Sequence, residues 1–238
     1  MGEPGAGPPL ALFWDIDGTL LSTAQAGVFA LEDAAREVLG VEPDFSSLNT
    51  PGLTDFQVAT VAIEAAGGEP SPATVEAFVR VYERELPGRL HARRGSVLTG
   101  VEAILEDLAG REDVLSLLLT GNTEAGARAK LHHYGLLDYF PAGAFSLDGS
   151  DRASIARRAR DLAAEKLGAS PPAERMWVIG DTPRDVECGQ AIGVHTLAVA
   201  SGGFTVEELR GSDPTVAIEA LPGPEAFLEL VGHVSGRA

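Results

Sequence analysis

Two acids stand close together in an otherwise apolar stretch near the start of the chain. The segment LFWDIDGTLL, residues 12–21, contains Asp15 and Asp17, followed directly by Gly18. Ionised carboxylates are costly to remove from water, so a buried strand is an expensive place for two of them. Either they form a turn with Gly18 after an edge strand, or they carry out chemistry. The next residues, GTL, and a matching acidic segment downstream favour chemistry.

Two other apolar runs also end in polar groups. The run at 114–120 leads into Thr120, Gly121 and Asn122, and the run at 176–181 leads into GDTPRD, residues 180–185. Ligands of open α/β sheets bind outside the carboxyl ends of the strands. Three strand ends therefore offer carboxylates, a hydroxyl and glycine-exposed amides to one crevice.

The elements that must position these groups alternate between two kinds. Short apolar runs, typical of strands buried on both faces, occupy residues 10–16, 114–120, 176–181 and 195–200. Amphipathic stretches typical of helices occupy residues 100–110, 124–135, 154–168 and 185–193, and a last strand and helix are expected at 213–221 and 224–231. This order predicts βαβ units, and hence an α/β fold with a Rossmann-like parallel sheet.

The region after the first strand breaks the alternation. Segments 26–40, 55–67 and 72–86 all look helical, and no convincing strand separates them. We therefore expect an α/β core made of two stretches, an inserted α-helical cap and a flexible tail. The expected bounds are 10–21 and 97–238 for the core, 22–96 for the cap and 1–9 for the tail.

Composition excludes several classes of partner. The chain has 35 acidic and 18 basic residues, a formal net charge of −17, which argues against nucleic acid and anionic membranes as partners. Cys188 is the only cysteine, so no internal disulfide and no cysteine-based zinc site is expected. No apolar run approaches the roughly 20 residues of a membrane span. The start lacks the pattern of a signal peptide, so we expect a cytoplasmic protein; its oligomeric state is unknown.

The motifs, taken in order, resemble those of the haloacid dehalogenase-like superfamily. They are DIDGTL (15–20), TGN (120–122), a basic residue opening a later helix, and GDTPRD (180–185). The acid at position 17 and the helical insert are similar to those of phosphatases of the phosphoglycolate phosphatase kind. The resemblance runs from Leu10 to about Leu230. It implies hydrolysis of a small phosphomonoester, with a small phosphorylated metabolite as substrate.

The resemblance implies a role for each acid. Asp15 would be the nucleophile that forms an aspartyl phosphate, and Asp17 the general acid and base. Mg²⁺ would be held by Asp15, the backbone carbonyl of Asp17 and Asp181, with Asp185 as a further ligand or supporting acid. Such a cation would offset the cost of gathering the carboxylates. For Asp185, a simple helix-capping role is the alternative.

The resemblance also implies a phosphate grip at the second strand end. Thr120 and the amide of Gly121 would hold the phosphoryl oxygens. Exposed amides at the start of the helix after TGN, with Asn122, would add a favourable anion site.

The chain departs from the family at its third motif, usually a lysine. The chain has two lysines, Lys130 and Lys166, and neither opens the helix before the third strand end. Arg152, just before that helix, is our candidate for the positive charge, although arginine and lysine differ in geometry. Arg157 and Arg158 would lie further from the sheet edge.

In the cap, the segment GLTD, residues 52–55, has two interpretations. Thr54 and Asp55 either cap a helix or belong to a loop that reads the substrate over the crevice. Residues 91–95, HARRG, are interpreted as a linker.

Several activities stay open. Asp17 argues against dehalogenation, which needs no acid there, and a cap without lysine disfavours phosphonate hydrolysis through a Schiff base. A β-phosphoglucomutase-like mutase remains an alternative, as does a binding module that has lost hydrolysis. The organic part of the substrate is not readable: 2-phosphoglycolate, sugar phosphates and nucleoside monophosphates all remain candidates.

Overall fold

A six-stranded parallel sheet forms the core of the protein in a computed structural model, which describes residues 8–232. The strand order is β5-β4-β1-β6-β7-β8, and every neighbouring pair is parallel. The strands are β1 Leu10–Trp14, β4 Val114–Leu119, β5 Gly143–Ala144, β6 Met176–Gly180, β7 His195–Val199 and β8 Val216–Ile218. The expected Rossmann-like α/β fold is therefore confirmed.

Strand β1 lies inside the sheet, between β4 and β6, and all its residues are buried. Its side chains alternate between two apolar clusters, as the pleat of a strand requires. Leu12 and Trp14 pack in the cluster that includes Phe227, whereas Ala11 and Phe13 pack in the other. This two-sided burial explains why the first strand reads as a continuous apolar run.

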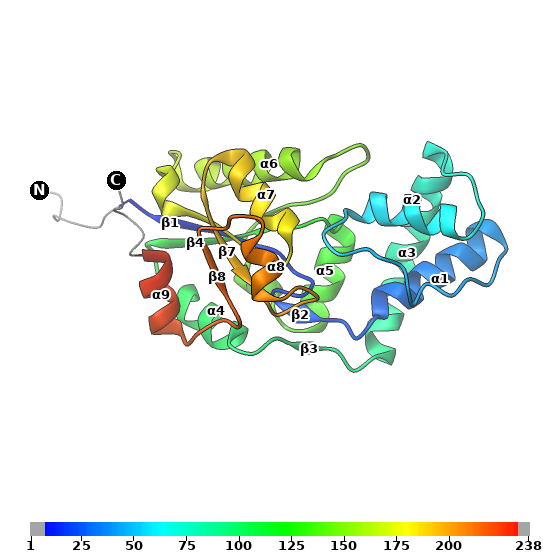
Figure 1. The fold of residues 1–238 in the computed structure, drawn as a ribbon, viewed down its shortest axis with the longest axis horizontal. Helices are drawn as coiled ribbons and strands as arrows, with labels where there is room; N and C mark the ends of the chain where they lie inside the picture. Colours follow the sequence, from blue (N-terminus) through cyan, green and yellow to red (C-terminus); the bar gives the residue numbers. More distant parts are fainter. Residues whose placement is uncertain (1–7, 233–238) are drawn as a thin grey trace, which may run out of the picture.

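Helices cover both faces of the sheet. Figure 1 shows α6 and α7 on one side and α4 and α9 on the other. Their bounds are α4 Val101–Ala109, α5 Glu124–His133, α6 Arg152–Leu167, α7 Pro183–Ile192, α8 Val206–Arg210 and α9 Pro224–Gly232, with short 3₁₀ turns at Leu137–Tyr139 and Ala173–Arg175. In the part of the chain that the structure describes, no helix has the length and apolar character to cross a membrane.

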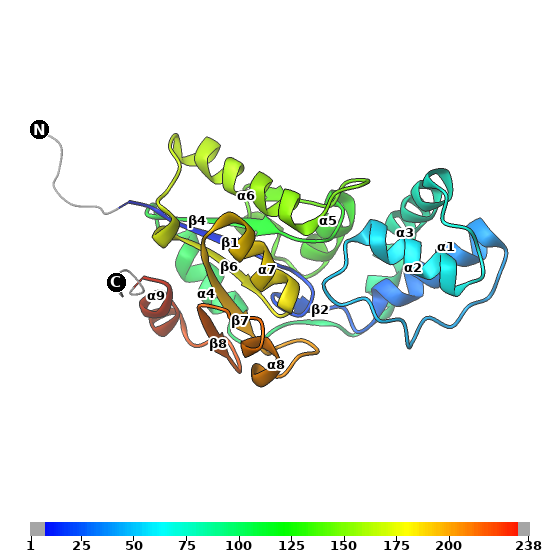
Figure 2. The same cartoon turned by 45° about the horizontal axis from the view of Figure 1, so that its top comes forward.

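Three helices form a separate bundle beyond the carboxyl ends of the strands (Figures 1 and 2). They are α1 Ala26–Leu39, α2 Asp55–Ala65 and α3 Pro72–Ala92, and they share their own apolar cluster around Phe78 and Leu86. The chain enters and leaves this bundle through an antiparallel ribbon of β2 Leu21–Ser22 and β3 Ser96–Val97, in which Leu21 pairs with Val97. We call the segment between these strands the cap; its independence as a domain stays a prediction.

The structure corrects some expected boundaries. Helix α3 continues through Pro87 to Ala92, beyond the expected end at residue 86, because the buried side chains of Leu86 and Leu90 keep that stretch packed. The last strand covers only Val216–Ile218 of the expected 213–221. Strand β5, helix α8 and the β2–β3 ribbon were not anticipated. Most of the expected tail, residues 1–7, lies outside the described residues.

Candidate active site

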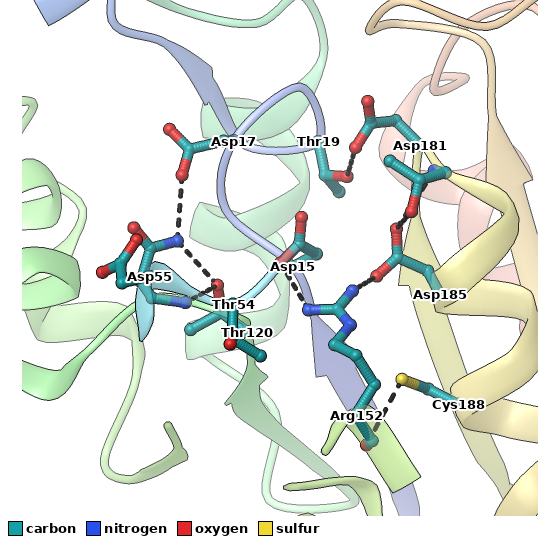
Figure 3. Close-up of polar contacts among 12 residues, drawn as sticks. Asp15, Asp17, Thr19, Thr54, Asp55, Thr120, Arg152, Asp181, Asp185 and Cys188 are labelled. Carbon is teal, nitrogen blue, oxygen red and sulfur yellow. Dashed lines mark hydrogen bonds and ion pairs between the residues drawn. The ribbon is translucent and has the colours of Figure 1, made fainter. Parts of the chain in front are cut away.

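Three strand ends meet at one edge of the sheet. Asp15 follows β1, Thr120 follows β4 and Asp181 follows β6, and β1 lies between the other two strands. Figure 3 shows their side chains around a common space. A cavity of about 320 Å³ opens there between the core and the cap. Of the residues singled out in the sequence, it is lined by Asp15, Asp17, Asp55, Thr120, Gly121, Asn122, Arg152 and Asp181.

The turn after β1 depends on Gly18. Its φ of +82° lies in the left-handed region that favours glycine, and its amide donates to the carbonyl of Leu21 at 2.9 Å. A Cβ at this position would run into the carboxylate of Asp181. Glycine therefore lets two strand ends approach each other, while the Thr19 hydroxyl donates to Asp181 at 3.1 Å.

Three buried acids form a cluster. Asp15, Asp181 and Asp185 each offer a carboxylate oxygen within 4.8 Å of the others. Burial, then repulsion from Asp185, raises the pKa of Asp15 to about 7. The same two causes raise the pKa of Asp181 to about 8. A set of hard oxygen donors that repel one another fits a divalent cation such as Mg²⁺.

Arg152 supplies a fixed positive charge beside this cluster. It is the first residue of α6, and its side chain is 9% exposed. The guanidinium contacts Asp185 and lies 3.9 Å from the carboxylate of Asp15 (Figure 3). Burial opposes the charge on Arg152, but Asp185 and Asp15 raise its pKa, so it stays protonated. The structure thus brings Arg152 to the place where the sequence analysis expected a cation.

Asp185 has two kinds of contact. Its carboxylate accepts hydrogen bonds from the amide and hydroxyl of Thr182, at 3.0 and 2.7 Å, as part of a capping box at the start of α7. The same carboxylate contacts Arg152 and belongs to the acidic cluster. Helix capping and a place at the site are therefore compatible for this residue.

The loop after β4 is held by its own side chains. The buried hydroxyl of Thr120 accepts hydrogen bonds from the side-chain amide of Asn122, at 2.8 Å, and from its backbone amide, at 3.3 Å. Position 121 requires glycine, because a Cβ there would lie 2.7 Å from the carbonyl oxygen of Leu53. Glycine thus permits the cap to pack directly on this loop.

Lys130 is a site residue that the sequence analysis missed. Its side chain is 6% exposed, and its ammonium donates to the carboxylate of Asp17 and to the side-chain oxygen of Asn122, both at 2.5 Å. Asn122 also donates to Asp17 at 2.9 Å. Burial lowers the pKa of Lys130, but the charge of Asp17 and its other acidic neighbours raises it further, so the ammonium stays charged.

The position of Lys130 in the sequence of α5 could have shown that it belongs to the site. The helix starts directly after the TGN loop, and Lys130 shares its buried face with Ala127 and Leu131. A lysine on the apolar face of a helix is rare unless it is paired. The same pairing explains why the carboxylate of Asp17, 43% exposed, points away from the acidic cluster and toward α5.

The cap is docked on the TGN loop through Asp55. Its amide donates to the carbonyl of Gly121 at 2.8 Å, and its carboxylate accepts from the amide of Thr123 at 2.7 Å. Thr54, just before it, is the N-cap of α2 and forms a capping box with Gln57. Burial raises the pKa of Asp55 to about 6, partly opposed by Lys130. The capping interpretation thus holds for Thr54, whereas Asp55 faces the cavity.

A parallel sheet covered by helices, with clustered carboxylates at its strand ends and a helical insert above them, is a Rossmann-like core with an inserted cap. The chain belongs to the haloacid dehalogenase-like hydrolases, because the model of that family matches residues 10–193. The expected family is therefore confirmed.

Two curated relatives are similar over most of the chain. Tyrosine-protein kinase PtkA of Mycobacterium tuberculosis (strain ATCC 25618 / H37Rv) is 28% identical over 92% of this chain and 71% of its own length. The probable phosphatase IndB of Dickeya dadantii (strain 3937) is 28% identical over 94% of this chain and 92% of its own length.

Solved structures share the fold. A predicted phosphatase from Clostridium acetobutylicum has a TM-score of 0.71 at 20% identity, covering 95% of this chain and 100% of its own. A predicted phosphoglycolate phosphatase from Haemophilus somnus 129pt has a TM-score of 0.72 at 14% identity, covering 94% and 97%. At such identities the likeness concerns the fold alone.

Proposed function

We propose that the protein is a Mg²⁺-dependent phosphatase that hydrolyses a small phosphomonoester through an aspartyl phosphate. The observation that carries this proposal is the cluster of Asp15, Asp181 and Asp185 beside the buried guanidinium of Arg152. Membership of a hydrolase family and the similarity to a protein named as a probable phosphatase support it.

Asp15 is the nucleophile in this proposal. A carboxylate oxygen bonds to phosphorus as the ester P–O bond breaks, and Asp17 gives its proton to the departing alkoxide. Water then attacks the phosphorus of the aspartyl phosphate and returns a proton to Asp17, which frees Asp15 and inorganic phosphate. In each step one bond to phosphorus forms, another breaks and one proton is transferred. Asp17 therefore acts as the acid in the first step and as the base in the second.

Charge on the phosphoryl oxygens must be balanced in both steps. Arg152, the hydroxyl of Thr120 and the amides of the TGN loop would stabilise that charge from fixed positions. Mg²⁺, held by Asp15, Asp181 and the backbone carbonyl of Asp17 with Asp185 beside them, would supply further positive charge. Lys130 and Asn122 would position Asp17, since both side chains grip its carboxylate.

The test is Mg²⁺-dependent release of phosphate from p-nitrophenyl phosphate. We expect Asp15→Asn to abolish release and Arg152→Ala to lower kcat/KM at least about 10²-fold, as loss of a charged transition-state contact does. Asp107→Asn, an exposed acid on α4, is the matched control and should keep wild-type activity. Equal rates for the wild type and Asp15→Asn would refute the proposal.

The same assay separates hydrolysis from the mutase alternative. Sugar 1-phosphates with a trace of bisphosphate would be isomerised by a mutase without release of phosphate. We expect phosphate release instead.

A further inference from the structure

The wall that the cap contributes to the cavity carries no cation among the residues that the structure describes. Val28, Leu31 and Val58 give this wall an apolar surface, and Gln25 and Tyr82 add uncharged polar groups. Asp55 is the acid on this side. A substrate held under the cap therefore meets no cap side chain that could pair with a second negative charge.

The cations on the core side of the cavity already have partners. Arg152 contacts Asp185 and Asp15, and Lys130 contacts Asp17 and Asn122. Both cations are more than nine-tenths buried. A carboxylate that approached Lys130 would come close to Asp17, so its attraction to the ammonium would be offset by repulsion.

Carboxylates outnumber cations around the cavity. Four acids line it, namely Asp15, Asp17, Asp55 and Asp181, against two basic side chains, Lys130 and Arg152. A divalent cation would only balance the excess negative charge of these side chains, and the phosphoryl group of the substrate adds further negative charge. The formal net charge of −17 repels further anions at long range.

We infer that the substrate is the phosphomonoester of a small neutral alcohol, and that esters carrying a second anionic group are selected against. This rests on the proposed function. The phosphoryl group lies at the strand ends, and the alcohol part packs against Val28, Leu31 and Val58, with a hydroxyl within the reach of uncharged groups such as Gln25. The inference removes 2-phosphoglycolate from the candidate substrates.

Two esters of similar size test this selection. 2-Hydroxyethyl phosphate carries a neutral CH₂OH group where 2-phosphoglycolate carries a carboxylate. We expect kcat/KM for phosphate release to be at least about tenfold higher for the neutral ester, because like charges placed close together disfavour binding. An equal or higher kcat/KM for 2-phosphoglycolate would overturn the inference and leave the phosphatase proposal intact.

Binding gives a readout that does not need turnover. Calorimetry on the Asp15→Asn protein with Mg²⁺ should show tighter binding of 2-hydroxyethyl phosphate than of 2-phosphoglycolate. If phosphate release failed for every ester while this order of affinity held, the phosphatase proposal would fall and the charge selection would stand. The reverse order of affinity would overturn the selection.

A charge placed in the cap wall provides the matched variant. Val58 is half-buried on α2 and lines the cavity, so Val58→Lys should shift the ratio of the two specificity constants at least about fivefold toward 2-phosphoglycolate. Val58→Met lengthens the same side chain without charge and separates size from charge. A ratio in Val58→Lys equal to that in Val58→Met, with both proteins folded by circular dichroism, would count against the inference.

Discussion

Asp17 and Lys130 form an ion pair, and the proposed mechanism also assigns proton transfer to Asp17. The proposed acid role requires Asp17 to carry a proton, and the ammonium of Lys130 contacts its carboxylate at a distance of 2.5 Å. The ammonium and the amide of Asn122 fix the direction of that carboxylate. We therefore interpret Lys130 as a positioning residue for Asp17 rather than as a contact of the phosphoryl group.

Removing this ammonium should affect poor leaving groups most. An alkoxide needs the proton from Asp17, whereas p-nitrophenolate leaves without one. For Lys130→Met we expect kcat/KM to fall about tenfold more for an alkyl phosphate than for p-nitrophenyl phosphate, within the usual range of general acid catalysis. kcat/KM reports the steps up to the aspartyl phosphate, so the later role of Asp17 as a base does not enter.

Lys166→Met is the matched control for Lys130→Met, because Lys166 is exposed near the end of α6. It should change neither specificity constant. Equal losses on both esters in Lys130→Met would show a general structural effect instead of a role in positioning Asp17.

At the scale of elements, the start of α2 is fastened to the start of α5. Asp55 makes both hydrogen bonds of this contact, one to Gly121 and one to Thr123. Asp55 is half-buried, and this burial raises the pKa of its carboxyl group from 3.8 to about 6. The folded state therefore binds this proton more tightly than the unfolded state does.

The raised pKa of Asp55 predicts that the difference in stability between the wild type and Asp55→Asn depends on pH. Since the folded-state pKa is raised, the contribution of Asp55 to stability is complete below about pH 4 and is lost as the pH rises through about 6. Asp55→Asn keeps the backbone amide and a side-chain oxygen but does not titrate. The Tm of Asp55→Asn relative to wild type should therefore rise between pH 4.5 and pH 7; a constant difference would show that the carboxyl is not perturbed.

The sequence predicts the buried strands and the long helices better than the short elements and the exact element ends. Strands β1, β4, β6 and β7 are buried on both faces, so their apolar runs can be recognised without the fold, and their ends locate Asp15, Thr120 and Asp181. Strand β5 has only two residues, and α3 continues through a proline. In both cases tertiary packing outweighs the local signal.

The site shows the same division. Residues in motifs are found from spacing, and Arg152 from its place just before the expected helix 154–168, which in the structure begins at Arg152 itself. Lys130 contacts Asp17, which lies 113 residues earlier in the chain, and Asn122 of the TGN loop. The apolar face of α5 signals that this lysine has a partner, but no local pattern identifies the distant Asp17 as that partner.

At the scale of the whole molecule, the acidic cluster links metal binding to folding. Burial and repulsion raise the pKa values of Asp15 and Asp181 to about 7 and about 8. Without metal, both carboxyls stabilise the fold when protonated, and this contribution is lost as the pH rises through these values. A divalent cation that binds the ionised carboxylates of the folded state would restore it.

We therefore expect the Tm in EDTA to fall between pH 5.5 and pH 8.5. Added Mg²⁺ should raise the Tm by more at pH 8.5 than at pH 5.5, because fewer protons then compete with the ion. Asp181→Asn should weaken the effect of Mg²⁺ at both pH values, whereas Asp107→Asn should not. A Tm that did not respond to Mg²⁺ at any pH would argue against a metal at the cluster.

The double contact of Asp55 has a consequence for the order of events in a catalytic cycle. Any swing of the cap away from the core must break both hydrogen bonds, and their partners are Gly121 of the TGN loop and the adjoining Thr123. Figure 3 shows Asp55 beside Thr120 of the same loop. In the proposed mechanism, opening of the cap would therefore also loosen the loop that holds the phosphoryl oxygens. Cap opening and the release of inorganic phosphate would then be coupled through the two hydrogen bonds of Asp55.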